Sequence, residues 1–161
     1  QGTAALEFLE QTEGLDAIIT PVGGGGLLSG TAIVTRSALP NSKVFAAEPT
    51  GADDAFRSFE SGELIPQTGP NTIADGLLTS LGNLTWPIIR DHVDAIFTVD
   101  DDSIASAMRL IWERAKIVVE PSGAVPLAAV LSERFQSEFN GNRIGIIISG
   151  GNVNLDRLPW Q

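Results

Sequence analysis

The residues of this chain whose type and spacing most directly suggest chemistry are four consecutive glycines: Gly23, Gly24, Gly25 and Gly26. They follow a short apolar run at residues 17–20, which is typical of a buried strand, and precede a helical pattern that begins at Leu27. Glycine lets backbone N–H groups come close to an anion, and the N-terminus of the following helix adds positive charge. A tight turn by itself would need only one or two glycines. The run of four therefore predicts a phosphate-binding loop.

A second group of residues could bind a metal ion. Glu48 and Asp54 lie six residues apart and bracket a turn whose main-chain carbonyl can join them, with Asp53 beside the second carboxylate. Oxygen ligands of this kind favour Mg²⁺, Ca²⁺ or Mn²⁺. The alternative is that Asp53 and Asp54 only form the acidic first turn of a helix, where the helix dipole stabilises carboxylates, and that Glu48 is unrelated to them. The residues alone leave both interpretations open.

The elements that must position these residues alternate between strands and helices. Apolar runs predict strands at residues 16–20, 43–48, 94–99 and 143–148. Helical patterns cover residues 3–13, 27–38, 52–60, 86–92, 100–116 and 121–139. Residues 61–82 are rich in Gly, Pro and Thr and are predicted to form an irregular loop that handles a ligand. The alternation predicts one three-layer α/β domain over residues 1–161, with a mainly parallel, twisted sheet and helices on both faces.

Ligands of such sheets bind beside the carboxyl ends of the strands. Four unusual segments fall at those ends or just beyond them: the glycine loop, Glu48 with the acidic pair after it, residues 119–122 and residues 149–152. Ser149 ends the last strand, where it could either bind a ligand or cap its own turn. The convergence of all four segments on one edge favours a binding site.

Composition excludes several functional classes. The 161 residues carry 20 acidic and 10 basic side chains, a formal net charge of −10, which argues against nucleic acid or an anionic membrane as partner. Because there is no cysteine, there is neither a disulfide framework nor a thiolate metal site, and a cytoplasmic location is expected. The first residues lack the basic start of a signal peptide, and a helix that begins at residue 3 predicts a cut or processed chain.

Several longer motifs resemble the second half of the serine racemase and threonine (serine) dehydratase family, a group of fold-type II enzymes that use pyridoxal 5′-phosphate (PLP). The resemblance extends from Gln1 to Asn154. Its most specific segments are PVGGGGL at 21–27, AEP at 47–49, TIADGL at 72–77, TWPIIRD at 85–91, VEPSGA at 119–124 and SGGNV at 149–153. It implies the large, cofactor-binding domain of an enzyme that racemises a small hydroxy amino acid or eliminates water from it.

Under this resemblance, main-chain N–H groups of the glycine loop and Leu27 bind the PLP phosphate. Ser149 faces the ring nitrogen of PLP with Gly150 beside it, and Glu120 is either close to the cofactor or a solvated carboxylate at a helix start. A neutral hydroxyl at this position does not hold the ring nitrogen protonated as a carboxylate would, so the ring is a weaker electron sink. That property suits racemisation and β-elimination better than transamination.

The resemblance also assigns ligands for ions and effectors. It selects Glu48, Asp54 and the main-chain carbonyl of Ala52 as ligands of a structural and activating divalent cation: Mg²⁺, Ca²⁺ or Mn²⁺. It matches Lys116 and Asn152 with residues that contact ATP in some serine racemases, which makes ATP a candidate effector. Asp75, Gly76, Thr79 and Ser80 match a loop under the cofactor in relatives, where they would help to line the substrate side.

One residue that the chemistry requires is absent from the matching positions. PLP enzymes need a lysine that binds the cofactor covalently and moves the Cα proton. The chain has two lysines, Lys43 and Lys116, and neither lies in the family's context for this role, so no catalytic residue is assigned here. The lysine and the loop that binds the substrate carboxylate are expected in an N-terminal half. The chain alone is therefore predicted to be inactive, and the larger enzyme is expected to be a homodimer.

Three alternative functions stay open. A 3-hydroxyaspartate dehydratase is one, because single residues around the substrate decide among serine, threonine and 3-hydroxyaspartate. A module that binds a phosphorylated ligand without chemistry is another, and the missing lysine favours it. The third is an enzyme of the same fold that replaces a β-substituent, as cysteine synthases do, but the pattern of Glu48 and Asp54 argues against it.

Overall fold

Four parallel strands form the centre of the structure, a computed structural model that describes residues 1–161. Their order in the sheet is β3-β2-β1-β4, and each neighbouring pair is parallel. Ile19 of β1 pairs with Phe45 on one side and with Ile146 on the other, which fixes the register across the sheet. The strands are β1 (Ala17–Pro21), β2 (Lys43–Pro49), β3 (Ala95–Val99) and β4 (Ile144–Ile146).

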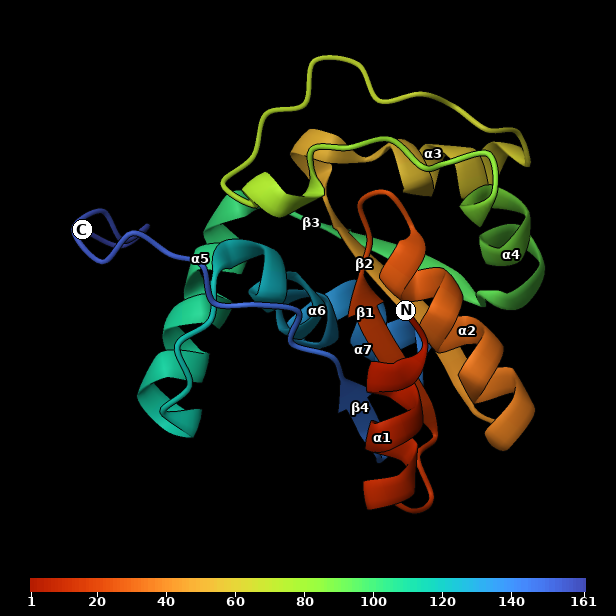
Figure 1. Cartoon of the computed structure of the whole chain (residues 1–161). Coiled ribbons are helices and arrows are strands. Elements are labelled where there is room, and N and C mark those ends of the chain that lie inside the picture. The colour runs from red at the N-terminus through yellow and green to blue at the C-terminus, as the bar shows by residue number, and fades with distance from the viewer.

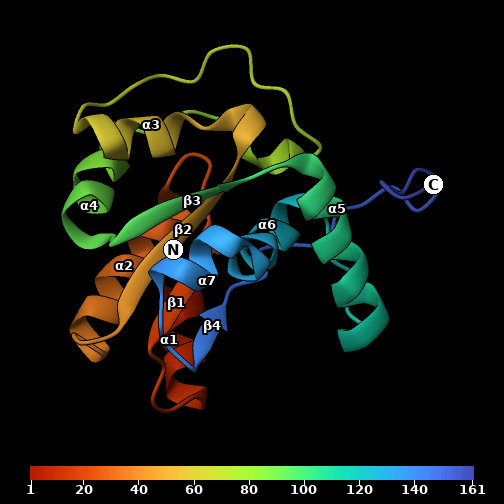
Figure 2. The ribbon, with the colours of Figure 1, turned by 180° about the vertical axis from the view of Figure 1, so that it is seen from behind.

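Helices cover both faces of this sheet, as Figures 1 and 2 show from opposite sides. One face carries α1 (Thr3–Gln11), α2 (Gly26–Ala38), α3 (Asp54–Ser61) and α4 (Thr85–His92). The other face carries α5 (Asp101–Leu110), α6 (Pro121–Leu131) and α7 (Glu133–Glu138). Short turns of 3-10 helix, η1 (Thr50–Ala52) and η2 (Asp75–Leu77), and a π-helical turn, η3 (Ile111–Ala115), complete the connections. None of these helices has both the length and the apolar character needed to cross a membrane.

The core is divided in two because successive strand residues face opposite sides of the sheet. Ile18 and Val44 pack against the side of α2 and α4. Ile19 and Phe45 pack against the side of α5 to α7, where the Phe45 ring meets Phe135 edge to face at 5.5 Å between centroids. The three-layer α/β architecture predicted from the sequence is thereby confirmed.

Three predicted elements differ from the structure. The strand expected over residues 143–148 is limited to Ile144–Ile146, so Ser149 lies beyond its end. The helix expected over residues 121–139 is interrupted at Ser132, whose backbone is extended (φ −70°, ψ 148°) and whose hydroxyl accepts the N–H of Phe135 to cap α7. The helix expected to reach Lys116 leaves α geometry after Leu110 and continues as η3. Lys116 then ends that turn with a left-handed backbone, φ +60°.

Candidate functional site

A cavity of about 270 Å³ lies at the carboxyl ends of β1 and β4. It is lined by most of the cofactor-binding residues that the sequence predicts: Gly23, Gly24, Gly25, Gly26, Leu27, Glu120 and Ser149. Five further residues line it that are not among those cofactor-binding predictions: Pro21, Leu28, Gly76, Leu77 and Ser122. Residues from β1, α2, α6 and the segment after β4 thus converge on one space, as expected for a parallel sheet.

The glycine loop offers this cavity a row of free hydrogen-bond donors. The structure records no protein acceptor for the N–H groups of Gly23, Gly24 and Gly25. The N–H groups of Gly26 and Leu27 belong to the first turn of α2, where no intrahelical acceptor exists. Gly25 adopts φ +83°, a backbone conformation that glycine takes without steric cost. Free donors at a helix N-terminus form a site suited to an anion.

Residues 72–82, here called the strap, pass over the glycine loop on their way to α4 (Figure 1). The approach is close, because a Cβ added to Gly23 would lie 3.2 Å from the Cα of Leu77 and from the Oγ1 of Thr79. A side chain at position 23 would therefore fit only if the strap moved slightly away from the loop. The irregular loop that the sequence predicts at residues 61–82 does reach the cavity, through Gly76 and Leu77.

Hydrogen bonds hold the strap to three helices. Asp101 at the start of α5 accepts the Ile73 N–H at 3.1 Å, and Ser122 of α6 accepts the Gly76 N–H at 3.0 Å. Asp54 at the start of α3 accepts the Leu81 N–H at 3.0 Å. Ser122 is buried and comes directly after Pro121, so in the sequence it was interpreted only as part of a helix start.

Glu120 binds the segment that carries Ser149. Its carboxylate accepts the Asn152 N–H at 2.9 Å, and its own N–H donates to the Gly150 carbonyl at 3.1 Å. A Cβ added to Gly150 would lie 2.7 Å from a carboxylate oxygen of Glu120, so a side chain there would displace this carboxylate. Glu120, half-buried at the start of α6, thus links that helix to the segment that carries Ser149, and its role near the cofactor stays a prediction.

The two carboxylates of the predicted cation site are both buried. Glu48 accepts the N–H groups of Ala55 and Phe56 at 3.1 and 2.9 Å, which leaves its carboxylate at the N-terminus of α3. Burial, with a smaller contribution from the nearby Asp54 and Asp53, raises the pKa of Glu48 to about 8 despite those two N–H groups. Burial also raises the pKa of Asp54. Two buried acids with no cationic side chain bonded to either are electrostatically suited to a divalent cation.

One carboxylate oxygen of Asp54 indicates whether a cation would fit this site. Asp54 Oδ2 accepts the Leu81 N–H, whereas Asp54 Oδ1 is buried and has no hydrogen-bond partner. Such orphaned buried oxygens are rare, and a bound cation would satisfy this one. Ala52 lies in η1 between the two carboxylates, so its carbonyl can belong to the same site. No group of three or more His, Cys, Asp or Glu side chains gathers anywhere in residues 1–161, so any cation here depends on backbone oxygen and water as well.

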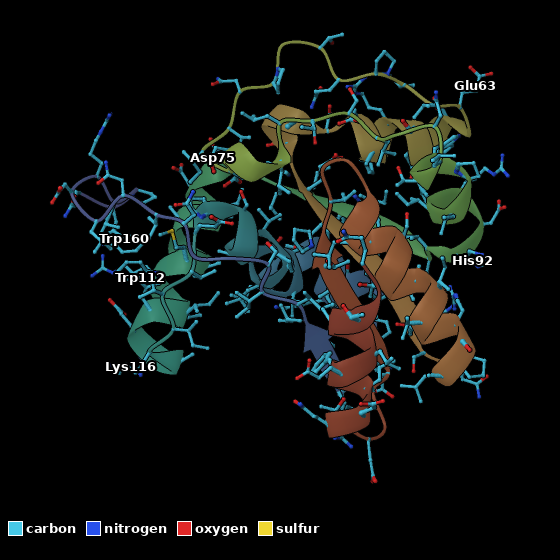
Figure 3. All side chains as sticks on the ribbon, viewed as in Figure 1. Glu63, Asp75, His92, Trp112, Lys116 and Trp160 are labelled. Atoms are coloured by element: carbon cyan, nitrogen blue, oxygen red, sulfur yellow. The ribbon has the colours of Figure 1, made fainter.

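The structure does not bring the two candidate ATP residues together. Asn152 lines a separate cavity of about 570 Å³ beside the strap, together with Asp75 and Arg157, and Lys116 is not part of it. Figure 3 shows Lys116 at the far end of the turn that follows α5, away from Asp75. Within this chain the pair forms no single pocket, and its role in ATP binding stays a prediction.

A parallel α/β sheet with free N–H groups at a helix N-terminus, and a serine from the segment after β4 lining the same cavity, has the features of a domain suited to a phosphorylated ligand. The family model of pyridoxal-phosphate dependent enzymes matches residues 1–150. The chain therefore belongs to this family of fold-type II PLP enzymes.

Individual relatives agree with that assignment. The serine racemase of Dictyostelium discoideum is 59% identical over 98% of this chain, and its crystal structure superposes with a TM-score of 0.91. The β-hydroxyaspartate dehydratase of Paracoccus denitrificans is 51% identical over 100% of the chain. The structure of maize serine racemase covers 96% of the chain at 49% identity, with a TM-score of 0.93. This chain spans about half the length of each: 49%, 50% and 48%.

Proposed function

We propose that this chain is the cofactor-binding part of a PLP-dependent enzyme that racemises or dehydrates serine or threonine. The observation that carries the proposal is the cavity at the carboxyl edge of the sheet, which is lined both by the glycine loop, with its free N–H groups, and by Ser149. Its 59% identity to a serine racemase supports this substrate class. A 3-hydroxyaspartate dehydratase is the second candidate, because the Paracoccus relative carries that name.

The chain's residues fit PLP by chemistry as well as by position. The N–H groups of Gly23, Gly24 and Gly25 would hold the phosphate, and Ser149 would hydrogen-bond the ring nitrogen. Bound PLP stabilises the negative charge that develops at the substrate Cα when its proton is removed. Because the Ser149 hydroxyl is neutral, it leaves the ring nitrogen unprotonated, which favours loss of the β-hydroxyl or return of the proton over transamination.

The lysine that binds PLP covalently would come from a segment outside these 161 residues. Lys43 begins β2, at the amino edge of the sheet, and its Nζ donates to Asp94 at 2.9 Å. Lys116 lies at the end of η3, and neither lysine lines the cavity. The substrate-carboxylate loop would come from the same outside segment. The cation site at Glu48, Ala52 and Asp54 would stabilise the start of α3 within this chain.

Borohydride reduction of the whole enzyme tests the proposal. Reduction fixes PLP on its lysine as a permanent mass increment, which we expect on a peptide outside residues 1–161. The same enzyme should convert L-serine to D-serine or to pyruvate and ammonia. A purified chain of residues 1–161 should show neither the increment nor turnover. A mass increment on Lys43 or Lys116 would contradict the proposal that the PLP-binding lysine lies outside residues 1–161. PLP binding without turnover by the whole enzyme would favour a binding module.

A further inference from the structure

Thr85, the first residue of α4, contacts the glycine loop through its hydroxyl group. Its hydroxyl lies 2.9 Å from the Gly24 carbonyl and 3.0 Å from the Gly82 N–H, which it accepts. A Cβ added to Gly25 would lie 2.8 Å from the same hydroxyl oxygen. Thr85 does not line the cavity, so it contacts the loop from outside the ligand space. It belongs to the TWPIIRD segment at residues 85–91.

The single proton of this hydroxyl has two carbonyls within reach. One is Gly24 at 2.9 Å and the other is Gly82 at 3.1 Å. The Gly82 carbonyl already accepts the N–H groups of Thr85 and Trp86, at 3.1 and 2.9 Å. The Gly24 carbonyl has no other donor in the structure. The Thr85 hydroxyl therefore donates its proton to the Gly24 carbonyl. The Gly82 N–H donates to the same hydroxyl oxygen and so limits its rotation.

This contact determines how the next peptide group is oriented. In a trans peptide the C=O and N–H groups point in opposite directions, and no peptide bond in the structure is cis. With the Gly24 carbonyl bound to Thr85, the Gly25 N–H must point away from Thr85. Glycine on both sides of this peptide gives it unusual freedom to rotate, so an external contact is needed to hold one orientation.

We propose that Thr85 is a positioning residue, which holds the Gly24–Gly25 peptide so that the Gly25 N–H is directed into the cavity toward the ligand phosphate. The inference rests on the proposed function, since it concerns the phosphate that the glycine loop would bind. Thr85 orders that donor before the ligand arrives, so binding does not have to select one orientation of a rotating peptide. This positioning role depends on the Thr85 hydroxyl and not on the Thr85 methyl group.

Two substitutions separate the hydroxyl from the rest of the side chain. Thr85→Val keeps the shape and removes the hydrogen bond, whereas Thr85→Ser keeps the hydroxyl and removes only the methyl group. Affinities of the apo form of the whole enzyme are measured for PLP and for pyridoxal, which lacks the phosphate. We expect Thr85→Val to weaken PLP about tenfold and pyridoxal less than about twofold, since one charge-assisted hydrogen bond is affected. Thr85→Ser should stay within about threefold of the parent for both ligands.

The phosphorus-31 NMR signal of bound PLP gives a second readout. It should shift in Thr85→Val and return to the parent position in Thr85→Ser. If the valine variant does not fold, Thr85→Ala removes the same hydroxyl with a smaller side chain. Equal PLP affinity in parent and valine variant, or equal losses for PLP and pyridoxal, would overturn the role of Thr85. A parent enzyme that binds pyridoxal as tightly as PLP would instead refute the phosphate cradle itself.

Discussion

Replacing Gly25 by alanine is expected to remove most of the affinity for PLP and to destabilise the fold. The left-handed backbone at φ +83° costs an alanine about 1–2 kcal/mol. The new Cβ would also lie 2.8 Å from Cδ1 of Ile89 and 2.9 Å from Cδ2 of Leu81. Both side chains are buried, so relief of this overlap costs about 1–3 kcal/mol more. Urea unfolding should show a total loss of about 3 kcal/mol.

The affinity effect follows from the displacement of the loop. Relief of the overlap moves the N–H groups on either side of Gly25 away from the phosphate, and loss of two charge-assisted hydrogen bonds weakens PLP binding by about a hundredfold or more. Gly62→Ala is the matched control. Gly62 has φ +75° with no atom within 4 Å of the added Cβ, so only the backbone cost should appear, with PLP affinity unchanged. Equal effects of the two substitutions on PLP binding would show that the loop does not hold the cofactor.

Removal of divalent cations is expected to lower the thermal stability of the whole enzyme, and Mg²⁺ to restore it. A cation would offset the burial of two acids, one of which has its pKa raised to about 8. At a cation concentration one hundred times Kd the stabilisation is about 2.7 kcal/mol. The measurement is the melting temperature in a chelator and then with Mg²⁺, Ca²⁺ or Mn²⁺ added in excess.

Neighbouring aspartates provide the control for this effect. Asp54→Asn keeps an oxygen that can accept the Leu81 N–H but removes the charge, and it should abolish the response to Mg²⁺. Asp53 instead pairs with Arg57 at 2.8 Å on the partly exposed side of α3, so Asp53→Asn should keep the response. If both variants respond as the parent does, the cation binds elsewhere or not at all.

Local sequence was sufficient to predict the glycine loop and the layers of the fold. The strand, the glycines and the helix follow one another directly along the chain, and each has its own periodicity or residue type. The same locality explains why Glu48 and Asp54 could be paired, since one short turn joins them. Sequence alone could not determine whether they bind an ion, because that depends on burial and on the absence of a cationic partner.

Residues that act across long separations could not be predicted. The Thr85 hydroxyl reaches Gly24 from 61 positions away, and Ser122 reaches Gly76 from 46 positions away. Neither contact leaves a pattern in the neighbouring residues, because both depend on how α4 and α6 pack on the sheet. The interruption at Ser132 has a different cause, since good helix formers flank it on both sides, Leu131 before it and Glu133 and Arg134 after it, and these favour one continuous helix.

The two carboxylate oxygens of Asp54 have different roles, and this difference connects the candidate cation site with the glycine loop. Oδ1 is the candidate cation ligand, and Oδ2 binds Leu81, which precedes the Gly82 that steadies Thr85. Metal and cofactor would thus act on the two ends of one short chain of contacts, so their binding free energies are expected to be coupled. Thermodynamic reciprocity then requires that the factor by which Mg²⁺ raises the affinity for PLP equals the factor by which PLP raises the affinity for Mg²⁺. Titration of each ligand with and without the other measures both factors, and a factor of one in both directions would show that the two sites are independent.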